Sequence, residues 1–323
     1  SRMIAETLSR KPEHNRALLS LYAEGSDGGK FLSPSAVNTW INCRMRFYYK
    51  YVCGMPEEEI LEKEIDQRRF GNIMHDALRR LYEPLRGSPG AGRAIARMAK
   101  DREQVRETII AAAIDEMHWD RETLMSGKGV IILDVLERYA RELLDYDGRI
   151  NDLKLLHLED DFTGLQTITT SAGEVRLRVG GRADRVDITE EVVRVVDYKT
   201  GVPKREAVTA DGLFDEAKEK RNDAILQALL YCTLIEPSHQ GRLVIPAIYW
   251  VQQLSSDDFT PYATAPGLDG PAAGREEWST FMSAFRSELS MTLNRIFSES
   301  EDFTMTSFRR RCASCPYRTL CRR

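Results

Sequence analysis

Apolar residues recur at helical spacing through most of the first 150 residues. Ser33 can cap a helix that carries Pro34 in its first turn, where proline is tolerated. Gly87-Ser88-Pro89-Gly90 interrupts the pattern, as turn-forming residues do. The spacing predicts a mainly helical N-terminal half, with helices over residues 3–22, 34–51, 66–83, 93–118 and 128–147.

The pattern changes near residue 153, where β-branched residues and alternation replace the helical spacing. This composition predicts strands over 153–162, 167–170, 175–179, 182–188, 192–198 and 243–251, with a turn at 189–191. Helices are predicted over 224–235 and 278–297, and a loop over 255–274. The order of helices, strands, helix and strand predicts an α/β fold.

Composition and charge narrow the class of protein. Of 323 residues, 42% are apolar and 30% charged, a balance typical of globular chains. No apolar run approaches the roughly 20 residues that span a bilayer, so we expect a cytoplasmic protein without a membrane segment. A net charge of −4 excludes a globally basic DNA-coating protein. A metal-dependent nuclease needs carboxylates, however, and can confine its basic residues to a groove.

Two acidic residues and a lysine lie on adjacent predicted strands. Asp197 and Lys199 are two residues apart, so in an extended strand they project from one face. A tight turn would bring Asp184 close to Asp197. Carboxylates hold Mg²⁺ or Mn²⁺, the ion activates water and phosphate, and an ammonium group orients water or offsets charge. The set predicts a metal-dependent phosphodiesterase, although a surface salt bridge would also explain Asp197 and Lys199 alone.

The sequence around these residues resembles a known nuclease family. Gly181-Arg-Ala-Asp184-Arg-Val-Asp187 and Asp197-Tyr-Lys199-Thr-Gly are similar to motifs II and III of the RecB-like branch of the PD-(D/E)XK nucleases. Gly71-Asn-Ile-Met-His75 resembles the family's G-x-x-x-H helix, whose histidine is a metal ligand. The resemblance implies a restriction-endonuclease-like core, a mixed central β-sheet flanked by helices, with a helical N-terminal region and insertion. It implies His75, Asp184 and Asp197 as metal ligands and Lys199 as a catalytic residue.

Two further positions follow the family's order. Gln227-Ala-Leu-Leu-Tyr231 resembles the Q-x-x-x-Y helix, which contacts DNA and supports the catalytic site. Gln227 and Tyr231 share a helix face, and a purely structural role is the alternative. Glu159 matches an acidic position on the first core strand, although it and its neighbours Asp160 and Asp161 could simply be exposed.

Three charged residues near the motifs keep more than one interpretation. Asp187 is expected to be a strand-end or salt-bridge residue rather than a ligand. Arg182 and Arg185 either contact phosphate or pair with the acids, and the sequence does not separate these roles.

Six cysteines do not suggest a disulfide framework in a cytosolic chain of this size. Cys312, Cys315 and Cys321 form a C-x2-C-x5-C group, with Cys43 as the candidate fourth ligand. The spacing alone permits Zn²⁺ in a four-cysteine site. The resemblance, closest to the AddB-type C-terminal nuclease domain, instead implies a structural [4Fe–4S] cluster held by one early and three late cysteines. Arg44 stands where the family usually has proline. Cys53 and Cys232 are expected to be ordinary small buried residues.

The resemblance implies a DNA nuclease acting on ends or single strands in recombinational repair, alongside a helicase partner. We expect an N-terminal stub or linker over residues 1–30 and a single nuclease domain over 31–323. Within it, the helical part covers about 31–150, the catalytic core about 151–260 and the C-terminal helix and cysteine tail about 275–323. One alternative is an inactive, cluster-bearing DNA-binding or scaffold module. Another is a stand-alone CRISPR-adaptation nuclease, which would leave the helical insertion unexplained.

Overall fold

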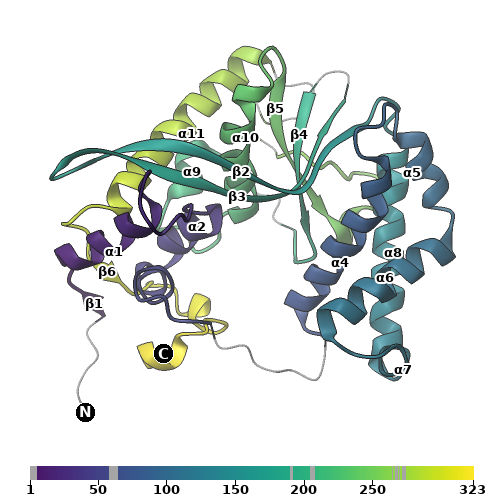
Figure 1. Ribbon diagram of the computed structural model, residues 1–323, viewed down its shortest axis with the longest axis horizontal. Helices are drawn as coiled ribbons and strands as arrows, with labels where there is room; N and C mark the ends of the chain where they lie inside the picture. Colours follow the sequence, from purple (N-terminus) through teal and green to yellow (C-terminus); the bar gives the residue numbers. More distant parts are fainter. Residues whose placement is uncertain are drawn as a thin grey trace.

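The computed structural model describes residues 6–57, 65–189, 192–203, 208–263, 265, 268, 270 and 274–323 (Figure 1). The predicted turn at 189–191 and the predicted loop at 255–274 lie partly outside the described residues. In the described part of the chain, no helix is long and apolar enough to cross a membrane.

A four-stranded mixed sheet forms the centre of the molecule. The strands are β2 (Lys154–Thr170), β3 (Gly173–Ile188), β4 (Val192–Lys199) and β5 (Leu243–Trp250), in the order β2-β3-β4-β5. β3 is antiparallel to both β2 and β4, whereas β5 is parallel to β4. A parallel neighbour requires a crossover, which here includes helix α10 (Asp223–Ile235). The sheet confirms the predicted α/β class.

The first four predicted strands are halves of two long ones. Residues 153–162 and 167–170 belong to β2, while 175–179 and 182–188 belong to β3. Gly180 interrupts the apolar pattern, but it pairs with Thr163 in an unbroken ladder. A Cβ there would lie 2.3 Å from the carbonyl oxygen of Phe162, so the strands approach closely because this residue is glycine.

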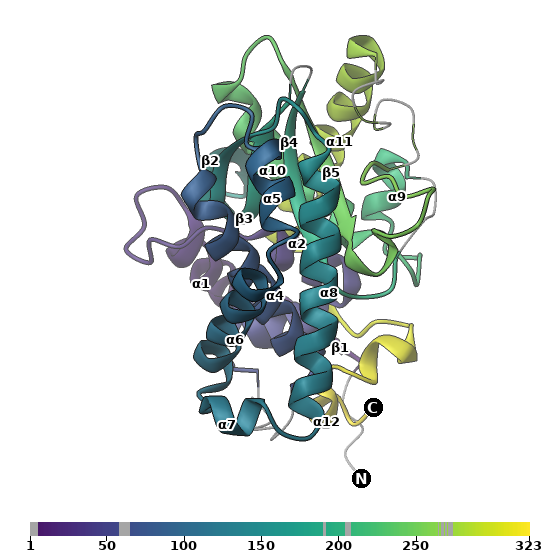
Figure 2. The ribbon, with the colours of Figure 1, turned by 90° about the vertical axis from the view of Figure 1, so that its right-hand side faces the viewer.

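Two helical layers cover the sheet (Figures 1 and 2). One hydrophobic cluster packs the sheet against α1 (Pro12–Tyr22), α2 (Pro34–Asn42), α10 and α11 (Arg275–Ile296). The second cluster packs the other face against the helical insertion, whose helices are α4 (Gln67–Tyr82), α5 (Gly92–Met98), α6 (Arg102–Met117), α7 (Arg121–Leu124) and α8 (Lys128–Gly148). Shorter elements are β1 (Thr7–Leu8), α3 (Arg44–Phe47), η1 (Tyr48–Val52), η2 (Glu83–Leu85), α9 (Ala210–Phe214), η3 (Glu236–Ser238), η4 (Val251–Gln253), β6 (Phe303–Thr304), η6 (Arg309–Cys312) and α12 (Arg318–Cys321).

Three helix predictions were wrong in extent. The helix predicted over 3–22 begins only at Pro12, because the preceding strand β1 pairs with β6 from the other end of the chain. The helix over 34–51 breaks at Cys43, whose backbone is extended (φ −167°, ψ 107°). The helix over 93–118 is divided into α5 and α6, and the Asp101 side chain caps α6 by accepting a hydrogen bond from the Gln104 N–H at 3.0 Å.

A buried ionic network ties the helical insertion to the sheet. Arg185 on β3 lies 2.5 Å from Asp147 on α8 and 2.8 Å from Asp187, and Arg194 on β4 lies 2.7 Å from Asp187. All four side chains are at most 1% exposed, and Tyr249 also donates to Asp147 at 2.8 Å. Arg185 therefore pairs with acids rather than contacting phosphate, and Asp187 is a salt-bridge residue as expected.

Removing one partner of this network should lower the stability of the fold. In Asp147→Ala, Arg185 would keep a fully buried charge without its main partner, so we expect a loss of about 3–5 kcal/mol in the free energy of unfolding. Urea denaturation followed by circular dichroism measures this. The matched control is Asp145→Ala on the same helix, which removes an exposed ion pair with Arg149 and should change stability by at most about 1 kcal/mol. Similar stabilities for both variants would contradict the importance of the network.

Candidate active site

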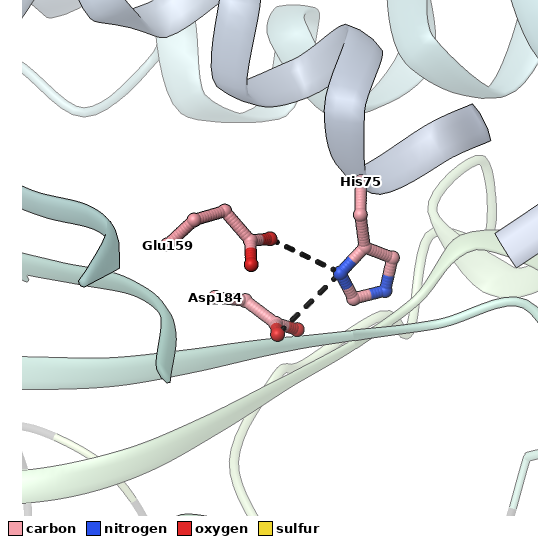
Figure 3. Close-up of side chains that lie close together, drawn as sticks. All are labelled: His75, Glu159 and Asp184. Carbon is pink, nitrogen blue, oxygen red and sulfur yellow. Dashed lines mark hydrogen bonds and ion pairs between the residues drawn. The ribbon is translucent and has the colours of Figure 1, made fainter. Parts of the chain in front are cut away.

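His75 on α4 faces two carboxylates from the sheet (Figure 3). Its Nδ1 atom lies 3.4 Å from Glu159 Oε1 on β2 and 3.4 Å from Asp184 Oδ1 on β3. One ligand atom from each of the three residues lies within 4.8 Å of the others, and among the described residues they are the one such group of histidine, cysteine or acidic side chains. Imidazole nitrogen and carboxylate oxygen are metal ligands, so this triad could hold a metal ion.

The register of β2 and β3 explains why Glu159 joins the group. The pairs Leu158↔Arg185 and Asp160↔Ala183 place Glu159 opposite Asp184. Glu159 also has φ +52°, in the left-handed region that a non-glycine residue in a strand rarely adopts. Such strain is often stored where a side chain must be held in a functional position. The sequence left open whether Glu159 is a site residue or simply exposed, and its place in the triad favours a site residue.

Asp197 and Lys199 lie beside the triad on β4. Their side chains share one face, as the sequence predicts, and Lys199 Nζ lies 2.7 Å from Asp197 Oδ2. Burial raises the pKa of Asp197 to about 6, opposed by Lys199 and reinforced by the nearby charge of Asp184. Asp197, expected as a metal ligand from the resemblance, is not in the 4.8 Å group, where Glu159 stands instead.

Tyr198 connects the triad to the buried network. Its backbone N–H donates to Asp184 Oδ2 at 2.8 Å, and its carbonyl oxygen lies 3.2 Å from His75 Nε2. Its hydroxyl, on the opposite side of β4, accepts a hydrogen bond from Arg185 at 3.1 Å. A histidine that donates one ring N–H to a carbonyl leaves its other nitrogen free for a metal. Sequence reasoning missed Tyr198, although its position between Asp197 and Lys199 places it on the face that packs against the insertion.

The charges of the triad depend on one another. Burial disfavours the His75 imidazolium, but Asp184 and Glu159 outweigh this and raise the histidine pKa to about 10. Burial disfavours the Asp184 carboxylate in turn, yet His75 and Lys199 outweigh it and lower the pKa of Asp184. Without a metal ion, His75 is therefore protonated near neutral pH. A cation bound by the carboxylates and the neutral ring has to displace that proton.

The α10 helix places Tyr231 next to the acids. Tyr231 is 5% exposed, and burial together with the charges of Asp184 and Asp197 raises its pKa. Its hydroxyl lies 2.7 Å from the point that a Cβ on Gly181 would occupy, so glycine leaves room for it on β3. Gln227 is half-buried one helical turn earlier. The structure thus brings Tyr231 toward the site.

Four cysteines from the two ends of the chain line one small cavity. They are Cys43, Cys312, Cys315 and Cys321. Tyr49 and Arg323 line the same cavity.

No three of the thiol sulfurs lie within 4.8 Å of one another in the described residues. A tetrahedral zinc site would need about 3.8 Å between sulfurs, given Zn–S bonds of about 2.3 Å. The two cysteines outside this cavity differ in burial. Cys232 is buried as expected, but Cys53, directly after η1, is exposed, so the prediction that Cys53 is buried was wrong.

Metal affinity should rise with pH. Because His75 has a pKa of about 10, Mn²⁺ has to displace one proton between pH 7 and 9, and we expect affinity to increase by about tenfold per pH unit. Asp197, with a pKa of about 6, is already ionised in this window. Isothermal titration calorimetry at several pH values measures the slope, with His75→Ala as the control that loses it. A wild-type affinity that does not change with pH would contradict this charge assignment.

Comparison with known families agrees with this geometry. The family model of the PD-(D/E)XK nuclease superfamily matches residues 31–322, whereas no curated protein matches the chain. The four-stranded mixed sheet flanked by helices is the restriction-endonuclease-like architecture expected from the sequence. The match includes every element that contributes to the triad, and the chain therefore belongs to the PD-(D/E)XK nuclease superfamily.

Proposed function

We propose that this chain is a divalent-metal-dependent deoxyribonuclease that hydrolyses phosphodiester bonds. The observation that carries the proposal is the meeting of His75, Glu159 and Asp184 beside the Asp197–Lys199 pair. The carboxylate oxygens of Glu159 and Asp184 are ligands that suit Mg²⁺ or Mn²⁺. Such an ion, when bound, polarises the phosphate and lowers the pKa of a water molecule.

The chain's own residues have separable roles in this proposal. His75, Glu159 and Asp184 hold the cation, and Asp197 adds a further carboxylate next to Asp184. Lys199, whose side chain is 30% exposed and whose ammonium group pairs with Asp197, orients the attacking water and offsets charge growing on the phosphoryl oxygens. The oxygen of that water forms the new bond to phosphorus as the water gives up one proton to solvent. The bond to the leaving oxygen breaks, and the leaving oxygen takes up one proton from solvent, so that protons balance.

The order of the motifs supports a narrower assignment. His75, Asp184, Asp197 with Lys199, and Gln227 with Tyr231 follow the order of the RecB-like branch. On that likeness we propose that the chain acts as an exonuclease on DNA ends or single strands, in cytoplasmic recombinational repair alongside a helicase. Gln227 and Tyr231 would then support the site from α10, where the buried Tyr231 already lies near the acids.

We further propose that the four cysteines hold a structural [4Fe–4S] cluster. Two observations support a thiolate-bound group: Cys43 and the three late cysteines share one cavity, and Arg46 and Arg323 line it with them. Burial raises the pKa of the Cys315 thiol, and the Arg46 guanidinium opposes that effect by favouring the thiolate. Because no three of these sulfurs lie within 4.8 Å of one another in the described residues, we favour the cluster over a single Zn²⁺ ion, which is the alternative. When bound, the cluster would supply a cross-link between the two ends of the chain, and hydrolysis requires no redox step.

Cleavage should depend on the acid–lysine pair. With Mg²⁺ or Mn²⁺ and labelled single- and double-stranded DNA, Asp197→Ala and Lys199→Ala should each lower kcat by about 100-fold or more. The matched controls are Asp152→Ala and Lys154→Ala, which replace exposed residues at the start of β2 and should cleave as the wild type does. Equal cleavage by all five proteins would point to a contaminant. Absence of cleavage with intact DNA binding would instead indicate an inactive DNA-binding module.

The metal content of the cysteine site is a separate test. Anaerobic purification followed by iron, sulfide and zinc analysis should give about four iron and four sulfide per chain. Cys43→Ser and Cys315→Ser should lose both, whereas Cys53→Ser, at an exposed position outside the cavity, should keep them. Zinc without acid-labile sulfide would end the cluster assignment and leave the nuclease proposal untouched.

A further inference from the structure

A charged groove of about 790 Å³ opens directly beside the triad. His75 and Glu159 form part of its wall, and three arginines line the rest of it together with carboxylates: Arg79, Arg86 and Arg182. We refer to this hollow as the arginine groove. Among the described residues, no phenylalanine, tyrosine or tryptophan lines it, and Leu158 is the one aliphatic side chain in the wall. Its chemistry therefore suits the charged backbone of a nucleic acid rather than stacked bases.

The spacing of the arginines relative to the triad follows from local geometry. Arg79 is four residues after His75 on α4, so the two share one helix face. Arg182 is two residues before Asp184 on β3, so the two share one face of the strand. Arg86 lies directly after η2, the short helix that follows α4. Each of the two elements, α4 and β3, thus carries an arginine next to a member of the triad.

These arginines are held by partners that an incoming anion can replace. Arg79 lies 2.8 Å from Asp76, Arg182 lies 3.3 Å from Asp161, and Arg86 pairs with Asp160. The three arginine side chains are 39%, 61% and 35% exposed, respectively. Exposed ion pairs of this kind contribute little to stability, so exchanging a carboxylate for a phosphate has a low cost. By contrast, Arg185 is fully buried in its network and is not accessible to DNA.

We propose that the arginine groove binds the backbone phosphates adjacent to the scissile one, on the strand that is being cut. This assignment rests on the proposed nuclease function and names the path of the substrate through the same site. Guanidinium groups bind phosphate with paired hydrogen bonds, which fixes the position of the strand without reading its sequence. The carboxylates of the triad repel phosphate until a divalent ion offsets them. Binding therefore depends on both the ion and the arginines.

DNA binding without cleavage isolates this role. Fluorescence anisotropy with a labelled 20-nucleotide oligo(dT), in Ca²⁺ in place of Mg²⁺, should give a Kd that rises about five- to tenfold for Arg79→Gln and for Arg182→Gln. The salt dependence, log Kd against log[KCl], should lose about 0.7 in slope for each arginine removed. Arg→Lys variants should recover the slope but only part of the affinity, because the paired geometry is lost. EDTA should weaken wild-type binding.

Matched controls use arginines with similar ion pairs outside the groove. Arg121→Gln and Arg149→Gln each remove an exposed guanidinium paired with a carboxylate and should leave Kd and slope unchanged. Thermal unfolding shows whether each variant is folded. An unchanged Kd and slope in the folded Arg79→Gln/Arg182→Gln double variant would overturn the proposal.

Kinetics separate this proposal from the nuclease assignment. If wild type cleaves, the arginine variants should raise KM and keep kcat near the wild-type value, and a fall in kcat alone would contradict a strand-binding role. If wild type binds in an arginine-dependent way but cleaves nothing in Mg²⁺ or Mn²⁺, the nuclease assignment fails while the groove stands. If it cleaves with no dependence on the arginines, the groove assignment fails alone.

Discussion

The buried ion pair between Arg185 and Asp147 is the contact on which the geometry of the site depends. Arg185 follows Asp184 on β3, so the arginine points into the insertion while the acid points to the site. The same alternation applies on β4, where the hydroxyl of Tyr198 meets Arg185. The side chains of Asp197 and Lys199, on either side of Tyr198, pair with each other. A shift of either strand by one residue would exchange these faces. It would also leave buried charges unpaired, which is strongly unfavourable.

This arrangement gives the helical insertion a role in the site. The α8 helix supplies Asp147, and α4 supplies His75, so both the partner of Arg185 and one member of the triad come from the insertion. The backbone of Tyr198 contacts Asp184 and His75, and its hydroxyl contacts Arg185, so this residue connects the triad to the buried ion pair. Backbone and buried groups therefore hold the side chains of the triad in place, which is the preorganisation that the proposed metal site requires.

Arginine illustrates how location decides the function of one residue type. Arg185 and Arg194 are desolvated and fully paired, so they stabilise one packing of the strands. Arg79 and Arg182 are of the same chemical type but remain partly exposed in weak ion pairs. Only the second kind can exchange partners with a phosphate, which reconciles a net charge of −4 with a substrate that is a polyanion. The cationic surface needed for DNA is local rather than global.

The sequence determined the chemistry of the site and most of the elements that carry it. Periodicity predicted α4, α10 and β4 within about two residues of their bounds, and the spacing of Asp197 and Lys199 put them correctly on one face. The pattern did not decide how segments meet. Glu159 joins the triad through the register of β2 with β3. The extended backbone of Cys43 interrupts the predicted helix, and Arg185 pairs with a residue 38 positions away in the sequence. Local propensity acts over a few neighbouring residues, whereas strand register, burial and ion pairing depend on contacts that exist only once distant segments have packed together.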